Sequence, residues 1–498
     1  MNEVVTQVAV VGAGAAGMYA ALCAARSGAR VTLVSATVLA ESSSYWAQGG
    51  LAAALAQDDS PEQHLADTIA AGRGAVRESA ARVLCDEARI AVEDLARLGI
   101  RFDVDRHGRL ALGLEGGHSA RRIVHAGGAS TGRQIIRELS VLVARHPAID
   151  VLERRRAIAV LTGDHRCVGV RLDDARTIAS AAVVLATGGA AALWSRTTNP
   201  TVANGGGLLL AFAAGASLAD LEMMQFHPTA VSAPNGADGF LVTEAVRGEG
   251  ARLLDDAGHR FVDELAPRDE VARAIARQMQ STGATSVGLD MREVDPALFP
   301  NVVTELRRAG IDPEHELVPV APAAHYMMGG IATNLDGRST LTGLYAVGEC
   351  SCTGLHGANR LASNSLTECF VFGARAARAA LAEPQPREAT LRAAQQTASA
   401  GTRPAQQTAY GGTRPPAITP ASREALWKYA GIERDRQGLA KLSDDPHPLV
   451  RLIASSALAR TESRGAHQRR DYPLLDPALD GLHVTIASGA EPAFARWD

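Results

Sequence analysis

The chain has 498 residues, of which 46% are hydrophobic and 21% charged, and its formal net charge is −4 at pH 7. At roughly 100–200 residues per domain, this length predicts two to four domains with ample cores. The mildly acidic balance argues against a nucleic-acid partner or an anionic membrane surface, because both favour a basic excess.

The chain starts with a polar stretch, and none of its apolar runs approaches the roughly 18 residues of a membrane-spanning helix. We therefore expect no signal peptide and no membrane partner. The six cysteines are scattered, and the close pair Cys350 and Cys352 lacks the second pair that a zinc site needs. This usage predicts free thiols, no bound metal and a cytoplasmic location.

The first predicted unit is a strand, a glycine turn, a helix and a second strand. Gln7–Val11 is β-branched, Ala15–Ser27 has helix composition, and Arg30–Val34 is again β-branched. This order is typical of a βαβ unit in a parallel sheet, so the fold class is α/β.

Two later strands also end in glycine. Ala181–Ala186 is followed by Thr187-Gly188-Gly189, and Leu344–Val347 is followed by Gly348-Glu349. Three separated strands with this ending predict one Rossmann-like nucleotide-binding domain assembled from two parts, residues 1–220 and 331–382. The intervening residues 221–330 are predicted to form an inserted domain.

Residues 383–422 are rich in Ala, Gln, Thr, Arg and Pro, and they contain a tandem repeat at 394–404 and 405–415 in which nine of the eleven positions match. The repeat is too polar to bury, so we interpret the segment as a flexible linker and expect 394–415 to be irregular and exposed. After it, Arg423–Leu442 and His447–Arg460 have amphipathic helix patterns. Residues 423–498 are therefore predicted to form a C-terminal helical domain.

The first motif that carries chemistry lies at the turn after the first strand. Its glycines allow a pyrophosphate to approach backbone N–H groups at a helix N-terminus, and its residues are Gly12, Ala13, Gly14, Ala15, Ala16 and Gly17. The acidic residue expected at the end of the second strand is replaced by Ser35, which can still hydrogen-bond a ribose hydroxyl. This replacement weakens a simple NAD interpretation.

Two further motifs favour binding of a ligand with a flat ring that can carry negative charge. A polar loop ending in two glycines suits a backbone pressed against such a ring, and it consists of Ser42, Ser43, Ser44, Tyr45, Trp46, Ala47, Gln48, Gly49 and Gly50. Gly348-Glu349 and the run from Gly354 to Leu366 precede the apolar helix Leu366–Ala380. A helix N-terminus there would stabilise the negative charge that a reduced flavin develops.

The order of these pieces resembles the flavoprotein family of succinate dehydrogenases, fumarate reductases and L-aspartate oxidases, and within it the L-aspartate oxidases most. The matching strings span nearly the whole chain outside the linker. They are Gly12–Gly17, Tyr45–Gly50, Glu115–Ser119 with Arg121 and Arg122, Gln225–Pro228, Thr243–Gly250, Ala266–Asp269, Ala324–Tyr326, Gly354–Leu366 and Glu462–Gly465.

The resemblance implies an FAD-binding domain, an inserted α+β capping domain at 221–330 and the C-terminal helical domain, with the active site between the first two. It implies that His227, His325 and Arg360 hold the substrate carboxylates, which need convergent donors such as the planar fork of arginine. Arg268 matches the family's proton-transfer arginine. Whether it acts as a base or only polarises the substrate stays open, because an arginine is ordinarily never deprotonated.

Further roles follow from the same resemblance. Glu244 and Arg247 match the residues that relay protons to Arg268. The FAD contacts carried over beyond the first two motifs are Gly189, Glu349, Asn364, Ser365 and Leu366. No histidine lies between Glu41 and Gln48, which implies non-covalent FAD, and Gly206 stands where the family usually has an acidic residue.

The function implied is FAD-dependent oxidation of L-aspartate to iminoaspartate, with reoxidation of the flavin by dioxygen, giving hydrogen peroxide, or by fumarate. In the family this is the first step of NAD biosynthesis, with iminoaspartate passed to quinolinate synthase. The alternatives are a soluble fumarate reductase and a non-catalytic FAD module, and the intact set of candidate active-site residues argues against the second. Glu115 is the candidate for substrate ammonium recognition, unless it simply pairs with Arg121 or Arg122 on a surface loop.

Overall fold

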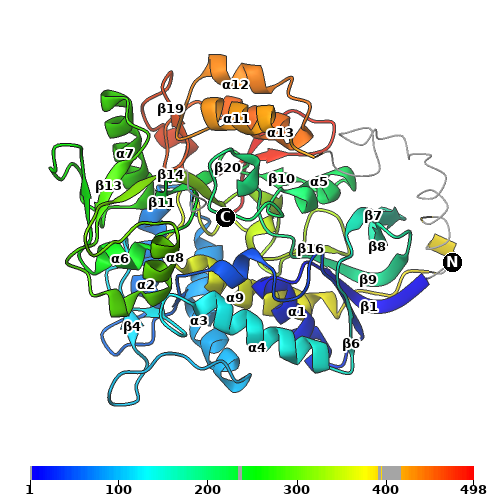
Figure 1. Ribbon diagram of the computed structural model, residues 1–498. Coiled ribbons are helices and arrows are strands. Elements are labelled where there is room, and N and C mark those ends of the chain that lie inside the picture. Colours follow the sequence, from blue (N-terminus) through cyan, green and yellow to red (C-terminus); the bar gives the residue numbers. More distant parts are fainter. Residues whose placement is uncertain (1–2, 234–237, 388, 391–393, 395–416) are drawn as a thin grey trace.

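The structure is a computed structural model that describes residues 3–233, 238–387, 389–390, 394 and 417–498. Figure 1 shows the main sheet with its helices in the lower right of the view, a second group around β11, β13 and α6–α8 at the left, and α11–α13 at the top. The predicted tandem repeat at 394–415 lies outside the described residues except for Ala394. Ala394 packs with Leu161 and Val168.

The main sheet has seven strands. Six of them follow the order β6-β2-β1-β9-β8-β7, and β16 pairs with residues 183–185 of β9, past the part of β9 that pairs with β8. The neighbours β6, β2, β1, β9 and β16 run parallel, as the βαβ pattern predicts, and β8 and β7 form an antiparallel extension. The strands are β1 (Glu3–Val11), β2 (Val31–Val34), β6 (Ile149–Leu152), β7 (Ala157–Gly163), β8 (Arg166–Leu172), β9 (Thr177–Leu185) and β16 (Leu344–Ala346).

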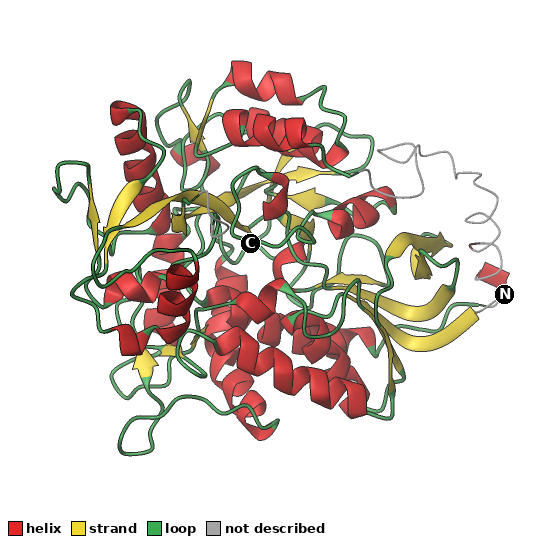
Figure 2. Cartoon of the chain, viewed as in Figure 1, coloured by secondary structure: helices red, strands yellow, loops and turns green. Residues whose placement is uncertain are grey.

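Both faces of this sheet are buried, which explains why its strands read as continuous apolar runs. Val8 and Val10 pack into one core, and Ala9 and Val11, which alternate with them, pack into another. The first core is covered by helices that Figure 2 shows grouped below the sheet, namely α1 (Ala15–Arg26), α3 (Glu78–Arg97), α4 (Thr131–Arg145) and α9 (Asn364–Ala380). The second lies under α5 (Gly206–Ala213) and the C-terminal helices.

Residues 221–330 contain a separate four-stranded antiparallel sheet, ordered β11-β14-β13-β12, with its own apolar core. We refer to this region as the cap. Its elements are β11 (Met224–Val231), α6 (Glu244–Gly248), β12 (Arg252–Leu254), α7 (Arg268–Thr282), β13 (Val287–Asp290), α8 (Pro300–Arg308) and β14 (Val318–Met327).

The C-terminal region contains the predicted helices, but their boundaries differ in one place. The prediction of a single helix over Arg423–Leu442 is wrong. The structure has two helices in this region, α11 (Pro420–Tyr429) and α12 (Arg436–Leu442). Gly431 lies so close to Trp427 that an added Cβ would fall 2.3 Å from its carbonyl oxygen, and Asp435 caps the second helix by accepting the Gly438 N–H. The second expected helix is confirmed as α13 (Pro448–Ala459).

Short strands tie the three regions together. A five-stranded sheet in the order β17-β15-β10-β20-β21 joins both chain crossings of the cap to the C-terminal region, and its members are β10 (Leu218–Ala219), β15 (Gly330–Ala332), β17 (Ser351–Cys352), β20 (Leu482–Ile486) and β21 (Ala493–Arg496). The remaining elements are β3 (Leu51–Ala52), α2 (Pro61–Ala71), β4 (Leu112–Gly113), β5 (Ile123–Val124), β18 (Glu433–Arg434) and β19 (Gln468–Arg469).

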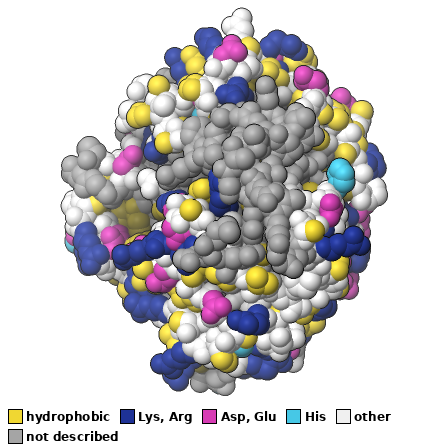
Figure 3. Space-filling model, turned by 90° about the vertical axis from the view of Figure 1, so that its right-hand side faces the viewer, with side chains coloured by type: hydrophobic (Ala, Val, Ile, Leu, Met, Phe, Trp, Pro, Cys, Tyr) yellow, Lys and Arg dark blue, Asp and Glu magenta, His cyan; other side chains and the backbone are white. Residues whose placement is uncertain are grey.

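Two kinds of feature are absent from the described part of the chain, membrane-spanning helices and metal sites. None of its helices has the length and apolar character needed to cross a membrane. No group of three or more His, Cys, Asp or Glu in it has the arrangement of a metal site, and its six cysteines are free. On the face drawn in Figure 3, basic and acidic side chains of described residues lie interspersed rather than gathered by sign.

Candidate active site

One large cavity of about 1410 Å³ runs between the main sheet and the cap. One part of its wall comes from the ends of β1 and β2, and another from cap residues on β11, α6, α7 and β14. Most of the predicted cofactor residues line it: Gly12, Gly14, Ala15, Ala16, Ser35, Ser42, Ser43, Ser44, Trp46, Ala47, Gln48, Gly49, Gly50, Glu349, Ser365 and Leu366. The cavity therefore brings together motifs that are far apart in the sequence.

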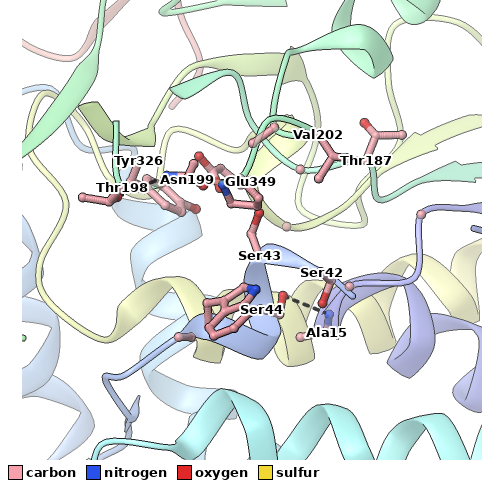
Figure 4. A pocket seen from close by; sticks show the side chains of 18 of the residues that line it. Ala15, Ser42, Ser43, Ser44, Thr187, Thr198, Asn199, Val202, Tyr326 and Glu349 are labelled. Carbon is pink, nitrogen blue, oxygen red and sulfur yellow. Dashed lines mark hydrogen bonds between the residues drawn. The ribbon is translucent and has the colours of Figure 1, made fainter. Parts of the chain in front are cut away.

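The turn between β1 and α1 is shaped for an anionic ligand. Gly12 has φ +112°, and a Cβ there would lie 2.1 Å from the carbonyl oxygen of Ala186, so only glycine fits. The helix cap Gly14 has no side chain to satisfy the first N–H groups, so those after Ala15 are left for a phosphate. The hydroxyl of Ser44 accepts the Ala15 N–H at 3.2 Å, and Figure 4 shows this contact at the cavity wall.

Several buried polar atoms of this wall have no hydrogen-bond partner among the described residues. They are the Ser42 hydroxyl, the Gln48 amide oxygen and the Thr187 hydroxyl. Buried polar groups are ordinarily paired, so these atoms indicate a polar ligand in contact with them. The glycine turn, the cavity size and these atoms fit a dinucleotide with a polar ring system such as FAD.

Two histidines from paired cap strands face each other at the cap side of the cavity. His227 on β11 and His325 on β14 have ring centroids 5.1 Å apart. The Thr229 N–H donates to Nδ1 of His227, so the remaining proton of the neutral ring is on Nε2. Burial first, and then the arginine charges nearby, hold the pKa of each ring well below its ordinary value. Both are therefore neutral hydrogen-bonding groups at pH 7.

Two buried arginines complete this end of the cavity. Arg268 is the first residue of α7, and Arg360 lies in the turn before α9. The Gln225 amide oxygen accepts from Nη1 of Arg268 at 3.4 Å and from Nε of Arg360 at 3.2 Å, so one side chain bridges both guanidinium groups. Burial, assisted by the charge of Arg268, lowers the pKa of Arg360 to about 10. Two cations at this end predict an anionic ligand.

Glu244 on α6 links Arg268 to Arg247. Its Oε2 accepts from Nε of Arg268 at 2.5 Å, and its Oε1 lies 3.7 Å from Nη2 of Arg247. Burial opposes ionisation of Glu244, but the charges of Arg268 and Arg247 outweigh burial, so the pKa of Glu244 lies below its ordinary value. Burial also lowers the pKa of Arg247. The three side chains form a continuous buried chain of ionisable groups that leads from Arg268 and Glu244 in the cavity wall to Arg247 behind it.

Glu115 lies in the cavity wall and not on a surface loop. Only 3% of it is exposed, and its Oε2 accepts the Ser363 hydroxyl at 2.7 Å. Arg122 pairs instead with Asp59 and Asp67, so the alternative of a surface pair with Arg122 is wrong. The alternative pairing with Arg121 also required a surface loop, which the burial of Glu115 contradicts.

Some of the predicted residues do not line the cavity. Arg247 lies behind Glu244, and Asn364 bonds His64 at 2.7 Å. Gly189 contacts Glu349, Gly17 packs against the Gly12 carbonyl, and Tyr45 lies beside Trp46. The lining also contains residues that sequence reasoning missed, namely Thr187, Thr198, Asn199, Thr243, Tyr326 and Ser363. Thr243 and Tyr326 stand next to predicted residues, but the loop of Thr198 and Asn199 carries no motif signal.

The missed loop positions a predicted residue. The Thr198 hydroxyl bonds Nδ1 of His325 at 2.8 Å, and the Asn199 amide donates to the His325 carbonyl at 2.6 Å. Figure 4 shows both side chains close to Tyr326 and Glu349, across the cavity from Ser42, Ser44 and Ala15.

The chain matches two family models, an FAD binding domain over residues 7–366 and the fumarate reductase flavoprotein C-terminal region over 443–488. An L-aspartate oxidase of Caulobacter vibrioides is 44% identical over 514 residues, which cover 97% of this chain and 96% of that protein. The chain belongs to the L-aspartate oxidase family. An L-aspartate oxidase of a Nostoc species is 50% identical over 390 residues, covering 74% of this chain and 67% of that protein.

Solved structures of fumarate reductases have the same fold as this family member. A quinol–fumarate reductase with menaquinol molecules superposes with a TM-score of 0.89 at 28% identity, covering 100% of this chain and 98% of that one. A mutant of the E. coli quinol fumarate reductase gives 0.88 at 27% identity, covering 100% of this chain and 97% of that one. The predicted α/β fold is thus confirmed, and the chain is an FAD-dependent oxidoreductase of this family.

Proposed function

We propose that this protein oxidises L-aspartate to iminoaspartate in the cavity between the main sheet and the cap. The observation that carries the proposal is the charge pattern of the cap end: two arginines and two neutral histidines lie near the buried carboxylate of Glu115, while Glu244, the other buried carboxylate at this end, is bonded to Arg268. L-Aspartate has the complementary pattern, two carboxylates and one ammonium group. A dicarboxylate that lacks an ammonium group would leave the negative charge of Glu115 without a cationic partner in a buried wall.

The substrate carboxylates would be held by His227, His325 and Arg360. The guanidinium of Arg360 offers two parallel donors to one carboxylate, which fixes its plane as well as its position. The histidines, being neutral, donate hydrogen bonds without adding charge to a site that already contains two arginines. Glu115 would accept the ammonium group and set which face of the α-carbon points along the cavity.

The proton that leaves the substrate nitrogen needs an acceptor and a route out. Arg268 lines the cavity, and its Nε is bonded to Glu244, whose other oxygen faces Arg247. Arg247 in turn donates to the Glu264 carbonyl. Protons would move along Arg268, Glu244 and Arg247, with Arg268 either accepting the proton or polarising the group that loses it.

The FAD would lie along the cavity wall described above and would accept the hydride from the substrate α-carbon. The N-terminus of α1, the loop 42–50 and the residues Glu349, Ser365 and Leu366 would hold it. The loop offers no histidine between Glu41 and Gln48, so we propose that the flavin is bound without a covalent bond. Ser35 and Gly206 both line the cavity. Ser35 contributes a hydroxyl where the dinucleotide-binding motif usually has an acidic residue, and Gly206 replaces an acidic residue of the family pattern, with its N–H donating to Asn204 Oδ1 at 3.1 Å.

A hydride and one proton leave L-aspartate as iminoaspartate forms, and the balance requires an acceptor for the two electrons of the hydride. We propose dioxygen, giving hydrogen peroxide, or fumarate, giving succinate. We also propose that iminoaspartate passes to quinolinate synthase as the first step of NAD biosynthesis in the cytoplasm. A soluble fumarate reductase is the second candidate, favoured by the structural likeness to quinol–fumarate reductase.

Product analysis tests the proposal. Purified holoenzyme is incubated with L-aspartate in air, and hydrogen peroxide is measured together with oxaloacetate and ammonia, into which iminoaspartate hydrolyses. We expect the three in equal amounts. Turnover of succinate instead of L-aspartate would favour the second candidate.

A further inference from the structure

Arg360 is a buried cation that has no carboxylate partner among the described residues. Its Nε donates to Gln225 at 3.2 Å, and its Nη1 donates to Ser365 at 2.9 Å, both neutral acceptors. A guanidinium held only by neutral groups beside a second cation tends to turn away or lose its charge. Something else must keep this side chain in place before a substrate carboxylate arrives.

The ring of Tyr326 provides a third support. The guanidinium carbon of Arg360 lies 4.5 Å from the centroid of that ring, within the range of a cation–π contact. Tyr326 lies on β14 directly after His325, and its ring lines the cavity. The hydrogen bonds to Gln225 and Ser365 therefore fix the guanidinium within its plane, while the Tyr326 ring supports it from one face.

Two buried residues outside the cavity lining hold Tyr326 in turn. The Tyr326 hydroxyl donates to Oε2 of Glu368 at 2.9 Å, and the same oxygen lies 2.9 Å from Nε2 of His356. The His356 ring also packs edge-on against Tyr326, with centroids 5.4 Å apart. Glu368 lies on α9, so this helix, whose first turn includes Ser365, fixes Arg360 by two routes.

The negative charge of Glu368 has an electrostatic consequence at the arginine. A phenol that donates its proton towards a carboxylate has more electron density in its ring, which strengthens the attraction to a cation over the face. Burial and Glu368 together raise the pKa of Tyr326 well above its ordinary value, so the phenol stays protonated and the arginine stays the charged partner.

We propose that Tyr326, held by Glu368 and His356, is a positioning residue that keeps the Arg360 guanidinium oriented for a substrate carboxylate. The inference rests on the proposed function, because it assigns Arg360 to a carboxylate. It names no new chemistry for Tyr326: the residue acts through Arg360. Its loss is expected to weaken dicarboxylate binding in ground state and transition state alike.

A similar phenol–carboxylate bond lies outside the cavity and supplies a control, where the arginine, Arg338, also pairs with the carboxylate. Tyr345 donates to Glu383 at 2.7 Å, and the guanidinium carbon of Arg338 lies 5.2 Å from the ring centroid. Neither Tyr345 nor Arg338 lines the cavity. A variant at Tyr345 therefore removes the same phenol–carboxylate bond at a place where no substrate is bound.

The test titrates fumarate into oxidised holoenzyme and follows the flavin absorbance, since an oxidised flavin cannot reduce fumarate. We expect Tyr326→Leu to raise the fumarate Kd about thirtyfold, the size of a desolvated cation–π contact. Tyr326→Phe and Glu368→Gln, which keep the ring, should raise it by only about threefold, and Tyr345→Phe by less than about twofold. In turnover, the KM for L-aspartate should rise more than kcat falls.

Melting temperature and FAD content are measured on every variant. Equal fumarate Kd values in wild type and Tyr326→Leu would overturn the inference alone. A loss of FAD and of melting temperature that parallels the loss of fumarate binding would also overturn it, because it would show a merely structural role. Should Tyr326→Leu not fold, the fumarate Kd values of wild type, Tyr326→Phe and Tyr345→Phe still decide, because only Tyr326→Phe is expected to bind fumarate more weakly by about threefold. A wild-type enzyme that does not bind fumarate would overturn the proposed function as well.

Discussion

Glu115 is the residue through which this site would distinguish L-aspartate from fumarate and succinate. Replacing Glu115 with Gln removes its charge and keeps its shape. The amide oxygen of glutamine can still accept the Ser363 hydroxyl, which lies 2.7 Å from the carboxylate in the present structure. The wall of the cavity should therefore stay intact while its only predicted ammonium partner becomes neutral.

The expected magnitude follows from the burial of Glu115, which is 3% exposed. Breaking a buried ion pair by removing one partner costs about 3–5 kcal/mol, because the remaining charge is left without compensation. The substrate ammonium would face two arginines, but the cavity is open to solvent in part, so we take the lower end of this range. About 3 kcal/mol corresponds to a loss of roughly two orders of magnitude in kcat/KM for L-aspartate.

The assay compares two reactions of the same variant. L-Aspartate oxidation is followed by peroxide formation, and fumarate reduction by oxidation of an artificial electron donor under anaerobic conditions. Glu115→Gln should abolish most of the first and preserve the second, because fumarate carries no ammonium. Glu383→Gln is the control, because Glu383 is an ion-paired carboxylate outside the cavity. Parallel loss of both activities would show that Glu115 is structural, and retention of both would place the discrimination elsewhere.

Three further predictions concern the proton route, the flavin and the pH dependence. Arg268→Leu should retain FAD and lower turnover by about two orders of magnitude or more, the effect of losing a proton-transfer or charge-stabilising group; near-normal turnover would remove Arg268 from the mechanism. Acid precipitation should leave the yellow flavin in the supernatant, and colour in the pellet would show a covalent bond. The melting temperature should fall from pH 7 to pH 5, because burial holds the pKa below 6.5 in five histidines, namely His64, His118, His227, His325 and His467. On acidification the unfolded chain takes up protons at these five rings, which favours unfolding. Burial raises the pKa of Glu222 and Glu349 to about 7, so at these two groups the folded chain takes up the protons, which favours folding. Each unbalanced proton costs about 1.4 kcal/mol per pH unit, and a melting temperature that rises on acidification would contradict the assignment.

Local sequence signals predicted the parts of the fold in which chemistry and backbone geometry are inseparable. The turn from Gly12 to Gly17 is one example, since a Cβ at Gly12 would meet the Ala186 carbonyl, and the strand, turn and helix around it could be placed from the sequence. The helix over Arg423–Leu442 was predicted wrongly because its apolar spacing continues through Gly431. The close approach of Gly431 to Trp427 and the helix cap at Asp435 separate the two helices, and the periodicity of apolar residues does not reveal these contacts.

The candidate site was predictable where motifs carry it and not where packing does. His227, His325, Arg268 and Arg360 stand in recognisable strings, and the fold brings all four to one end of the cavity. Contacts between distant segments had no such signal. The bond between Glu368 and Tyr326 joins residues on α9 and β14, and its meaning depends on the guanidinium above the ring, which only the structure shows.

The central claim is that L-aspartate delivers its electrons to the flavin bound in this cavity. The most direct measurement mixes the holoenzyme anaerobically with L-aspartate and records the flavin absorbance, with D-aspartate and succinate mixed in parallel. We expect rapid bleaching with L-aspartate alone, and recovery of the absorbance when fumarate is added. Bleaching by succinate in place of L-aspartate, or an unchanged spectrum with L-aspartate, would contradict it.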